Sequence, residues 1–186
     1  MYEVELKCRA DHEQLRGRLA ELGATRTDSR RQVDTYYDAP HRSFADTDEA
    51  LRIRRETPAA GAERTKLTYK GPLVEAESKT REEHETAVDD AAALAAALSA
   101  LGFEPAAVVE KDREYYSLEG YTVVLDAVDG LGSFVEVERE TDEASVEAVR
   151  EGAVELLDRL GLDADDQLRI SYLGLLLAAD GAADPE

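Results

Sequence analysis

The segment Tyr2-Glu-Val-Glu-Leu-Lys-Cys8 opens the chain with charged residues at every second position. A strand points successive side chains to opposite faces, so Glu3, Glu5 and Lys7 would project from one face and the residues between them from the other. In an ordinary half-buried sheet the charged face meets water. One strand of this kind is therefore compatible with a plain solvated surface.

The same alternation returns along the chain, in segments whose intervening residues are mostly apolar or small. It involves Arg52 and Arg54; Lys66 and Lys70; Lys79, Arg81 and Glu83; Lys111 and Arg113; and Glu136 and Glu138. All five lysines of the chain lie in these segments. This distribution indicates positions that need a compact ammonium group rather than general surface decoration.

The composition is strongly acidic, with 42 acidic against 22 basic residues and a formal net charge of −20. Such a field repels nucleic acid and anionic membranes, so neither is expected as a partner, and an anionic ligand would need a shielded basic pocket. A composition with few lysines and many acidic residues resembles that of a halophilic protein, adapted to a high-salt cytoplasm. With no apolar run of bilayer length, no signal pattern and a lone Cys8, we expect a soluble cytoplasmic protein without disulfides.

Turn and cap signals divide the chain into two similar halves. Asp11 followed by Gln14 predicts a helix start and Gly23 its stop, and an Ala-rich helix ends at Gly102. The predicted strands cover about residues 3–7, 32–38, 51–56, 64–70, 79–87, 108–117, 122–128 and 134–140. Two helices at about 142–160 and 165–178 follow, with a disordered tail at 179–186. The chain is thus predicted to be one domain over 1–178, with halves at about 1–72 and 79–140.

The two halves share an internal spacing that supports a repeat. Gly23 precedes Tyr36 by thirteen residues, and Gly102 precedes Tyr115 by the same distance. Each half reads as a strand, a helix and three strands. This pattern predicts a closed antiparallel β-barrel whose charged faces meet in a common interior, with the C-terminal helices outside.

A barrel interior filled with charge is costly unless the charges meet partners. The predicted inward cations are Lys7, Arg52, Arg54, Lys66, Lys70, Lys79, Arg81, Lys111 and Arg113, and the acids are Glu3, Glu5, Glu83, Asp126, Glu136 and Glu138. A structural ion-pair lattice is one solution. A polyanionic ligand with Mg²⁺ or Mn²⁺ would satisfy both sets at once, because carboxylates bind such ions and Arg and Lys bind phosphate oxygens.

The motifs of these segments resemble those of the CYTH superfamily, also called triphosphate tunnel metalloenzymes. Glu3-Val-Glu-Leu-Lys7 is similar to the E-x-E-x-K signature of that family. The other matching segments follow in the family's order: Gln32-Val-Asp-Thr-Tyr-Tyr-Asp38, Leu51-Arg-Ile-Arg54, Lys66-Leu-Thr-Tyr-Lys-Gly-Pro72, Lys79-Thr-Arg-Glu-Glu-His-Glu85, Lys111-Asp-Arg113, Leu125-Asp126 and Gly130-Leu-Gly-Ser-Phe-Val-Glu-Val-Glu138. The residues of two segments, Thr68-Tyr-Lys-Gly-Pro72 and Gly130-Leu-Gly-Ser-Phe134, together with Ser171-Tyr172, look most like the class IV adenylate cyclase branch.

The resemblance implies an α+β fold, an eight-stranded antiparallel barrel open at both ends, with helices packed outside. It implies Mg²⁺ or Mn²⁺ held by Glu3, Glu5, Asp126, Glu136 and Glu138. It implies triphosphate binding by Arg52, Arg54, Lys66, Lys70, Lys79, Arg81, Lys111 and Arg113. The predicted catalytic set is Lys7, Tyr36, Lys66, Lys111 and Arg113, with no general base assigned.

Some positions keep two interpretations. Asp129 competes with Asp126 but suits the turn at Gly130, and Asp126 is preferred because it shares strand parity with Val124 and Val128. Tyr36 is a packing residue or a catalytic one, and Lys79 is a solvated strand end or a tunnel-mouth residue.

Other positions have a structural interpretation. Glu83 and Glu85 either serve the site or only orient neighbouring arginines. His84 should face away from Arg81. Gly130 and Gly132 fit a hairpin turn better than a phosphate loop.

Three functions remain open at this stage. The leading one is class IV adenylate cyclase activity, which converts ATP to cyclic AMP and pyrophosphate. The alternatives are hydrolysis of tripolyphosphate or thiamine triphosphate, and a sensor that binds polyphosphate or nucleotide without turnover. The sequence leaves open whether the chain forms a homodimer.

Overall fold

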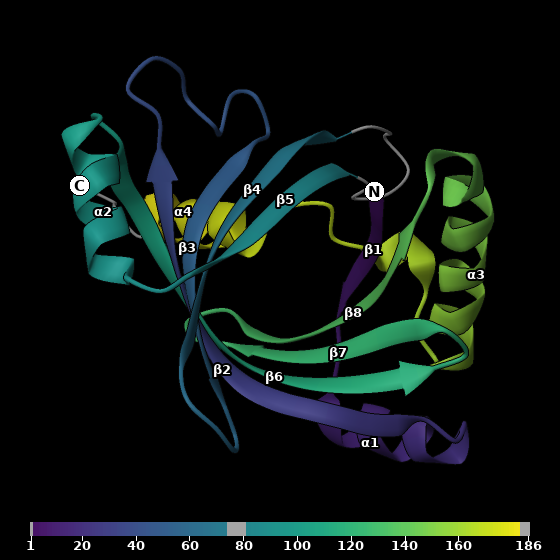
Figure 1. Cartoon of the computed structure of the whole chain (residues 1–186). Coiled ribbons are helices and arrows are strands. Elements are labelled where there is room, and N and C mark those ends of the chain that lie inside the picture. Colours follow the sequence, from purple (N-terminus) through teal and green to yellow (C-terminus); the bar gives the residue numbers. More distant parts are fainter. Residues whose placement is uncertain (1, 74–80, 183–186) are drawn as a thin grey trace.

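Figure 1 shows the computed structural model of the chain, which describes residues 2–73 and 81–182. Its eight strands close into one antiparallel barrel in the order β1-β5-β4-β3-β2-β6-β7-β8. The strands are β1 Tyr2–Arg9, β2 Thr25–Asp38, β3 Ala50–Pro58, β4 Arg64–Leu73, β5 Arg81–Val88, β6 Glu104–Leu118, β7 Tyr121–Val128 and β8 Gly132–Thr141. The predicted barrel is therefore confirmed.

Within the described residues, four α-helices accompany the barrel. They are α1 His12–Glu21, α2 Ala91–Ala100, α3 Val146–Arg159 and α4 Tyr172–Ala182, with short 3₁₀ turns η1 Glu143–Ser145 and η2 Ala164–Asp166. The Asp11 carboxylate accepts hydrogen bonds from the backbone N–H groups of Glu13 and Gln14, which fixes the start of α1. Gly23 and Gly102 follow α1 and α2 with φ of 77° and 88°, so both predicted stops are confirmed.

The main apolar core lies outside the barrel wall, between strands β1, β6, β7 and β8 and helices α1 and α3. Leu6 and Cys8 alternate with the charged residues of β1 and pack in one cluster with Val135 and Val137 of β8. Leu15 and Leu19 of α1, and Leu156 and Leu157 of α3, complete this cluster. The burial of this outer face stabilises the barrel and leaves the charged positions on its inner face.

Helix α4 differs from the expected arrangement. Its first residue, Tyr172, packs with Tyr36, Val109, Val128 and Phe134, which lie on the inner faces of four strands near one end of the barrel. Leu168, Leu173 and Leu176 add to this second cluster. In Figure 1, α4 lies at the far side of the barrel. The start of α4 therefore contacts side chains on the inner face of the barrel, a contact that the predicted exterior packing of this helix did not include.

Two strands begin earlier than the sequence predicted. β2 starts at Thr25 rather than near residue 32, and β6 starts at Glu104 rather than near 108. These strands pair along their length from Thr25↔Ser117 to Asp38↔Glu104. Exposed ion pairs hold the polar part together, since Arg31 contacts Glu110 at 2.7 Å and Asp112 at 2.9 Å. The early part of β2 is polar and carries no apolar alternation, and the early part of β6 contains Pro105, so the pattern missed both.

The C-terminal region also departs from prediction. The helix expected from about 165 begins only at Tyr172, because η2 is a single turn and Gln167 returns to an extended conformation. The backbone N–H of Leu168 then donates to the Lys7 carbonyl at 2.6 Å. Helix α4 includes residues 179–182, which were expected to be disordered, while 183–186 lie outside the described residues. None of the described helices is long and apolar enough to cross a membrane.

Candidate functional site

A cavity of about 460 Å³ occupies the barrel interior, and seven of the eight strands contribute to its lining. Most predicted site residues meet there. Those that line the cavity are Glu3, Glu5, Lys7, Tyr36, Arg52, Arg54, Lys66, Lys70, Arg81, Lys111, Arg113, Glu136 and Glu138. Asp126 does not line it, and Lys79 lies outside the described residues. Arg30, Glu56, Tyr115, Glu140, Ser171 and Tyr172 also line the cavity and were not predicted as site residues.

Carboxylates gather on β1 and β8. The register places Glu5 directly opposite Glu138, and Glu3 opposite Glu140. Like charges directly opposite on antiparallel strands destabilise a sheet. Burial and the neighbouring Glu3 raise the pKa of Glu138 to about 8, and burial raises the pKa of Glu3 to about 7 against the attraction of Lys70. Without a bound cation, the carboxyl groups of Glu3 and Glu138 therefore hold their protons more tightly than an exposed glutamate does.

The donor set of this wall suits a hard divalent cation, since it consists of carboxylate oxygens without sulfur or imidazole. Glu3, Glu5, Glu136 and Glu138 fit that chemistry. Among the described residues, however, no three His, Cys, Asp or Glu side chains are already arranged to hold a metal ion. Lys70 instead contacts Glu3 at 2.8 Å and Glu83 at 2.7 Å, so a metal would require these side chains to rearrange.

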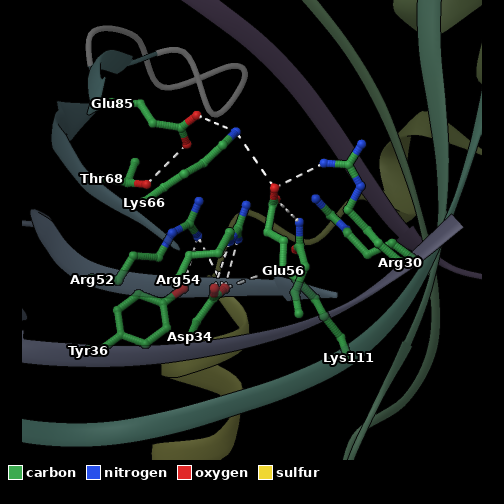
Figure 2. Close-up of polar contacts among 12 residues, drawn as sticks. Arg30, Asp34, Tyr36, Arg52, Arg54, Glu56, Lys66, Thr68, Glu85 and Lys111 are labelled. Carbon is green, nitrogen blue, oxygen red and sulfur yellow. Dashed lines mark hydrogen bonds and ion pairs between the residues drawn. The ribbon is translucent and has the colours of Figure 1, made fainter. Parts of the chain in front are cut away.

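The opposite wall carries cations arranged around Asp34 of β2 (Figure 2). Asp34 is fully buried and accepts two hydrogen bonds from Arg54, at 2.6 and 2.7 Å. Arg52 approaches it to 3.5 Å and Lys111 to 3.8 Å. Burial alone would raise the pKa of Asp34, but Arg52 and Arg54 hold it well below its usual range. One carboxylate thus anchors three cations that line the cavity.

A second group surrounds Glu56 of β3 (Figure 2). Arg30 and Gln32 donate to its two carboxylate oxygens at 3.0 and 2.7 Å. Lys66 lies between Glu56 at 3.7 Å and Glu85 at 2.7 Å. Glu83 and Glu85 therefore form ion pairs with Lys70 and Lys66. An anionic ligand would compete with these carboxylates for the ammonium of Lys66.

Arg113 of β6 is a cation of the cavity that contacts two carboxylates, Asp126 and Glu136. It donates to both oxygens of Asp126 at 2.5 Å and makes a further short contact with Glu136. The hydroxyl of Tyr172 donates to Asp126 at 2.8 Å. Arg113 and Tyr172 thus engage both oxygens of Asp126, and the same Arg113 nitrogen also joins Asp126 to Glu136 of the cavity wall. Its metal role stays a prediction.

Two lysines lie against the ring of Tyr172. The ammonium nitrogens of Lys7 and Lys111 lie 4.0 and 5.1 Å from its centroid. Burial, together with Arg113 and Arg54, lowers the pKa of Lys111 to about 7. Lys111 is therefore expected to lose its proton more readily than an exposed lysine. Tyr36 accepts a hydrogen bond from Arg52 at 3.2 Å, so it both packs in the apolar cluster and contacts the cation wall.

Two structural interpretations of the sequence are confirmed. His84 is exposed and contacts Glu82 at 3.2 Å, away from the cavity lining. Gly130 and Gly132 have φ of 78° and 100° in the turn between β7 and β8. Neither position contributes to the cavity.

Sequence reasoning missed Asp34 and Tyr172. Asp34 carried a usable signal, since it has the parity of Gln32 and Tyr36 within a predicted strand. Tyr172 carried only the family resemblance of Ser171-Tyr172, because nothing in a helical pattern indicates that the first residue of the helix contacts a barrel interior.

Comparisons with known proteins agree with this architecture. The profile of the CYTH domain matches residues 1–172. A Methanocaldococcus jannaschii protein named "Putative adenylate cyclase" is 36% identical over 177 residues, which cover 94% of this chain and 98% of that protein. The solved structure of the PH1819 protein from Pyrococcus horikoshii has a TM-score of 0.88 and 37% identity, covering 95% of this chain and 99% of that one.

A more distant solved structure shares the fold alone. It is a Hippeastrum protein described as a "putative adenylyl cyclase" with "a dominant" triphosphatase activity, at 19% identity and a TM-score of 0.67, covering 96% of this chain and 95% of that one. The profile match over nearly the whole chain and the full-length archaeal relative lead to one conclusion: the chain belongs to the CYTH domain family.

Proposed function

We propose that the protein binds a triphosphate with a divalent cation in its barrel and converts ATP to cyclic AMP and pyrophosphate. The observation that carries the proposal is one cavity with two chemically different walls, glutamates on β1 and β8 and cations around Asp34 and Glu56. The first wall suits Mg²⁺ or Mn²⁺ and the second suits phosphate oxygens. The name of the archaeal relative supports the choice of cyclase activity.

In this proposal each group has a definite task. Arg52, Arg54 and Arg113 bind phosphate oxygens, and Lys66 and Lys70 leave their glutamate partners to do the same. Glu3, Glu5, Glu136 and Glu138 hold the metal, which would neutralise phosphate charge and acidify a nucleophilic oxygen. The remaining predicted cations, Lys79 and Arg81, would serve the ends of the triphosphate.

Lys111 is the proposed base of the reaction. With a pKa of about 7 it is partly neutral at physiological pH, and it can take the proton of the ribose 3′-hydroxyl. The 3′-oxygen then bonds to the α-phosphorus, the bond to the bridging oxygen breaks, and pyrophosphate leaves with its electron pair. The surrounding arginines stabilise the charge that develops on the phosphoryl oxygens.

Triphosphatase activity is the second candidate. The cavity that holds a nucleoside triphosphate also holds tripolyphosphate, and in that reaction Lys111 would take a proton from water. The activity stated for the Hippeastrum protein favours keeping this candidate. Binding without turnover is the third, and the presence of both walls counts against it.

Product analysis separates these functions. The purified protein would receive ATP or tripolyphosphate, with Mg²⁺ or Mn²⁺ in concentrated KCl, and cyclic AMP, pyrophosphate, ADP and phosphate would be resolved. A Glu3→Ala, Glu5→Ala variant controls for contaminating activity. Cyclic AMP with pyrophosphate is the expected result. Phosphate released fastest from tripolyphosphate would transfer the assignment to triphosphatase, and metal-dependent binding without any product would favour a sensor.

A further inference from the structure

Tyr172 brings helix α4 into contact with the charged interior. Its side chain is 5% exposed and packs edge-on against Phe134, with 5.0 Å between ring centroids. Two local features fix this position. The Ser171 hydroxyl accepts a hydrogen bond from the backbone N–H of Gly174 at 3.0 Å and begins the helix, and Leu168 is tied to the backbone of β1.

The hydroxyl of Tyr172 ends a chain of polar contacts. It donates to Asp126, Asp126 accepts from Arg113, and Arg113 contacts Glu136. Asp126 therefore has its rotamer fixed from two sides. Since Asp126 holds both the Nε and an Nη of Arg113, the orientation of that guanidinium depends on a residue of α4.

The ring of Tyr172 serves the same region through a different interaction. Both Lys7 and Lys111 place their ammonium nitrogens within cation–π distance of its centroid, and both are almost completely buried. A buried ammonium loses its water, and an aromatic face replaces part of that stabilisation. The ring thus contacts two lysine side chains, and the hydroxyl orients an arginine through Asp126.

We infer that Tyr172 is a positioning residue, which aligns Arg113 with its hydroxyl and Lys7 and Lys111 with its ring for binding a triphosphate. This inference rests on the proposed function. Packing alone would not require the hydroxyl, because a phenylalanine would fill the apolar cluster equally well. A buried hydroxyl that donates to a carboxylate already paired with an arginine has an electrostatic task.

The test compares two tyrosines that each lose one hydrogen bond. Tyr172→Phe removes the contact to Asp126, and the matched control Tyr121→Phe removes a 2.9 Å contact to the carbonyl of Val149 on the outer side of the barrel. Tripolyphosphate affinity would be measured by calorimetry with Mg²⁺ in concentrated KCl, and thermal midpoints would be recorded for both. We expect both midpoints to fall by a similar few degrees.

Only the Tyr172 variants should lose affinity. A hydrogen bond to a charged group predicts an affinity about tenfold weaker for Tyr172→Phe, and the Tyr121→Phe control should stay within about twofold of the original protein. Tyr172→Leu, which also removes the aromatic face, should weaken binding by about a hundredfold, so that the phenylalanine variant restores part of the loss. If Tyr172→Leu does not fold, the comparison of the two phenylalanine variants decides.

The outcomes separate the two ideas. Equal affinities for Tyr172→Phe and Tyr121→Phe, with the original protein binding well, would overturn the role of Tyr172 and leave the proposed function standing. Failure of the original protein to bind tripolyphosphate would overturn both.

Discussion

At the residue scale, the two glutamates with raised pKa make a prediction about metal-free protein. The pKa of Glu138 rises from 4.5 to about 8 and that of Glu3 to about 7. The folded state then binds more protons than the unfolded state between about pH 4.5 and 8. Stability from these groups is complete below that window and is lost as pH rises through it. A bound divalent cation would favour the charged carboxylates and remove the loss.

Replacing Glu138 by glutamine tests this linkage. At pH 8 with EDTA, Glu138→Gln should raise the free energy of unfolding by about 1–3 kcal/mol, because the buried carboxylate no longer has to ionise. With saturating Mg²⁺ the original protein should gain more stability than the variant. Urea unfolding from pH 5 to 8 measures both effects, with the exposed Glu143→Gln as control. A variant less stable than the original at pH 8 in EDTA would contradict the account.

How far the sequence determines the site can be judged from individual residues. Alternation alone predicted Glu5 and Glu138 on one inner surface, because the period of a strand is independent of its partners. Their direct opposition depends on the register of β1 with β8, and no sequence pattern indicates that register. The same holds for Asp126, whose pairing with Arg113 follows from the cross-strand register of β6 and β7. The position of Tyr172 in the site involves a contact with Lys7, which lies near the other end of the chain, so local sequence patterns do not indicate it.

At the element scale, local signals fixed element type better than element ends. The caps of α1 and the glycine stops were read correctly, since hydrogen-bonding side chains and positive φ act within a few residues. The early start of β2 and the late start of α4 were missed. β2 is held there by cross-strand ion pairs with β6, and α4 is positioned by tertiary contacts with the barrel interior.

Helix α3 supports the strands that carry the glutamates, and this support can be measured. Leu156 is buried against the outer faces of β1 and β8 in the main apolar cluster. Leu156→Ala should lower the free energy of unfolding by about 2–5 kcal/mol through lost burial and the cavity left behind. Leu177→Ala on α4 is the matched control, since that leucine is 46% exposed and should change stability by less than about 1 kcal/mol.

Urea denaturation of both leucine variants measures the difference. Similar small losses for the two would show that the outer cluster repacks around the deletion, and that α3 adds little to the rigidity of β1 and β8. A large loss for Leu177→Ala would point instead to a buried role for that face of α4.

At the scale of the whole molecule, charge is distributed unevenly. Among the described residues, nine basic and eight acidic side chains line the cavity, while the chain carries a net charge of −20. The acidic excess therefore lies outside the cavity. The interior is nearly balanced by its own ion pairs, whereas the exterior repels itself and also repels an approaching triphosphate.

Salt should relieve the exterior repulsion. The electrostatic screening length falls from about 30 Å at 0.01 M to about 3 Å at 1 M ionic strength. Added KCl therefore suppresses repulsion between separated surface carboxylates. It acts little on buried ion pairs such as Asp34 with Arg54. Thermal midpoints should rise from low to molar KCl. A Glu143→Lys, Glu151→Lys variant, which lowers the negative charge at two exposed positions, should melt higher at low salt and gain less from KCl. A midpoint that stays flat from low to molar KCl would show that self-repulsion does not limit stability, and that the acidic surface has another role.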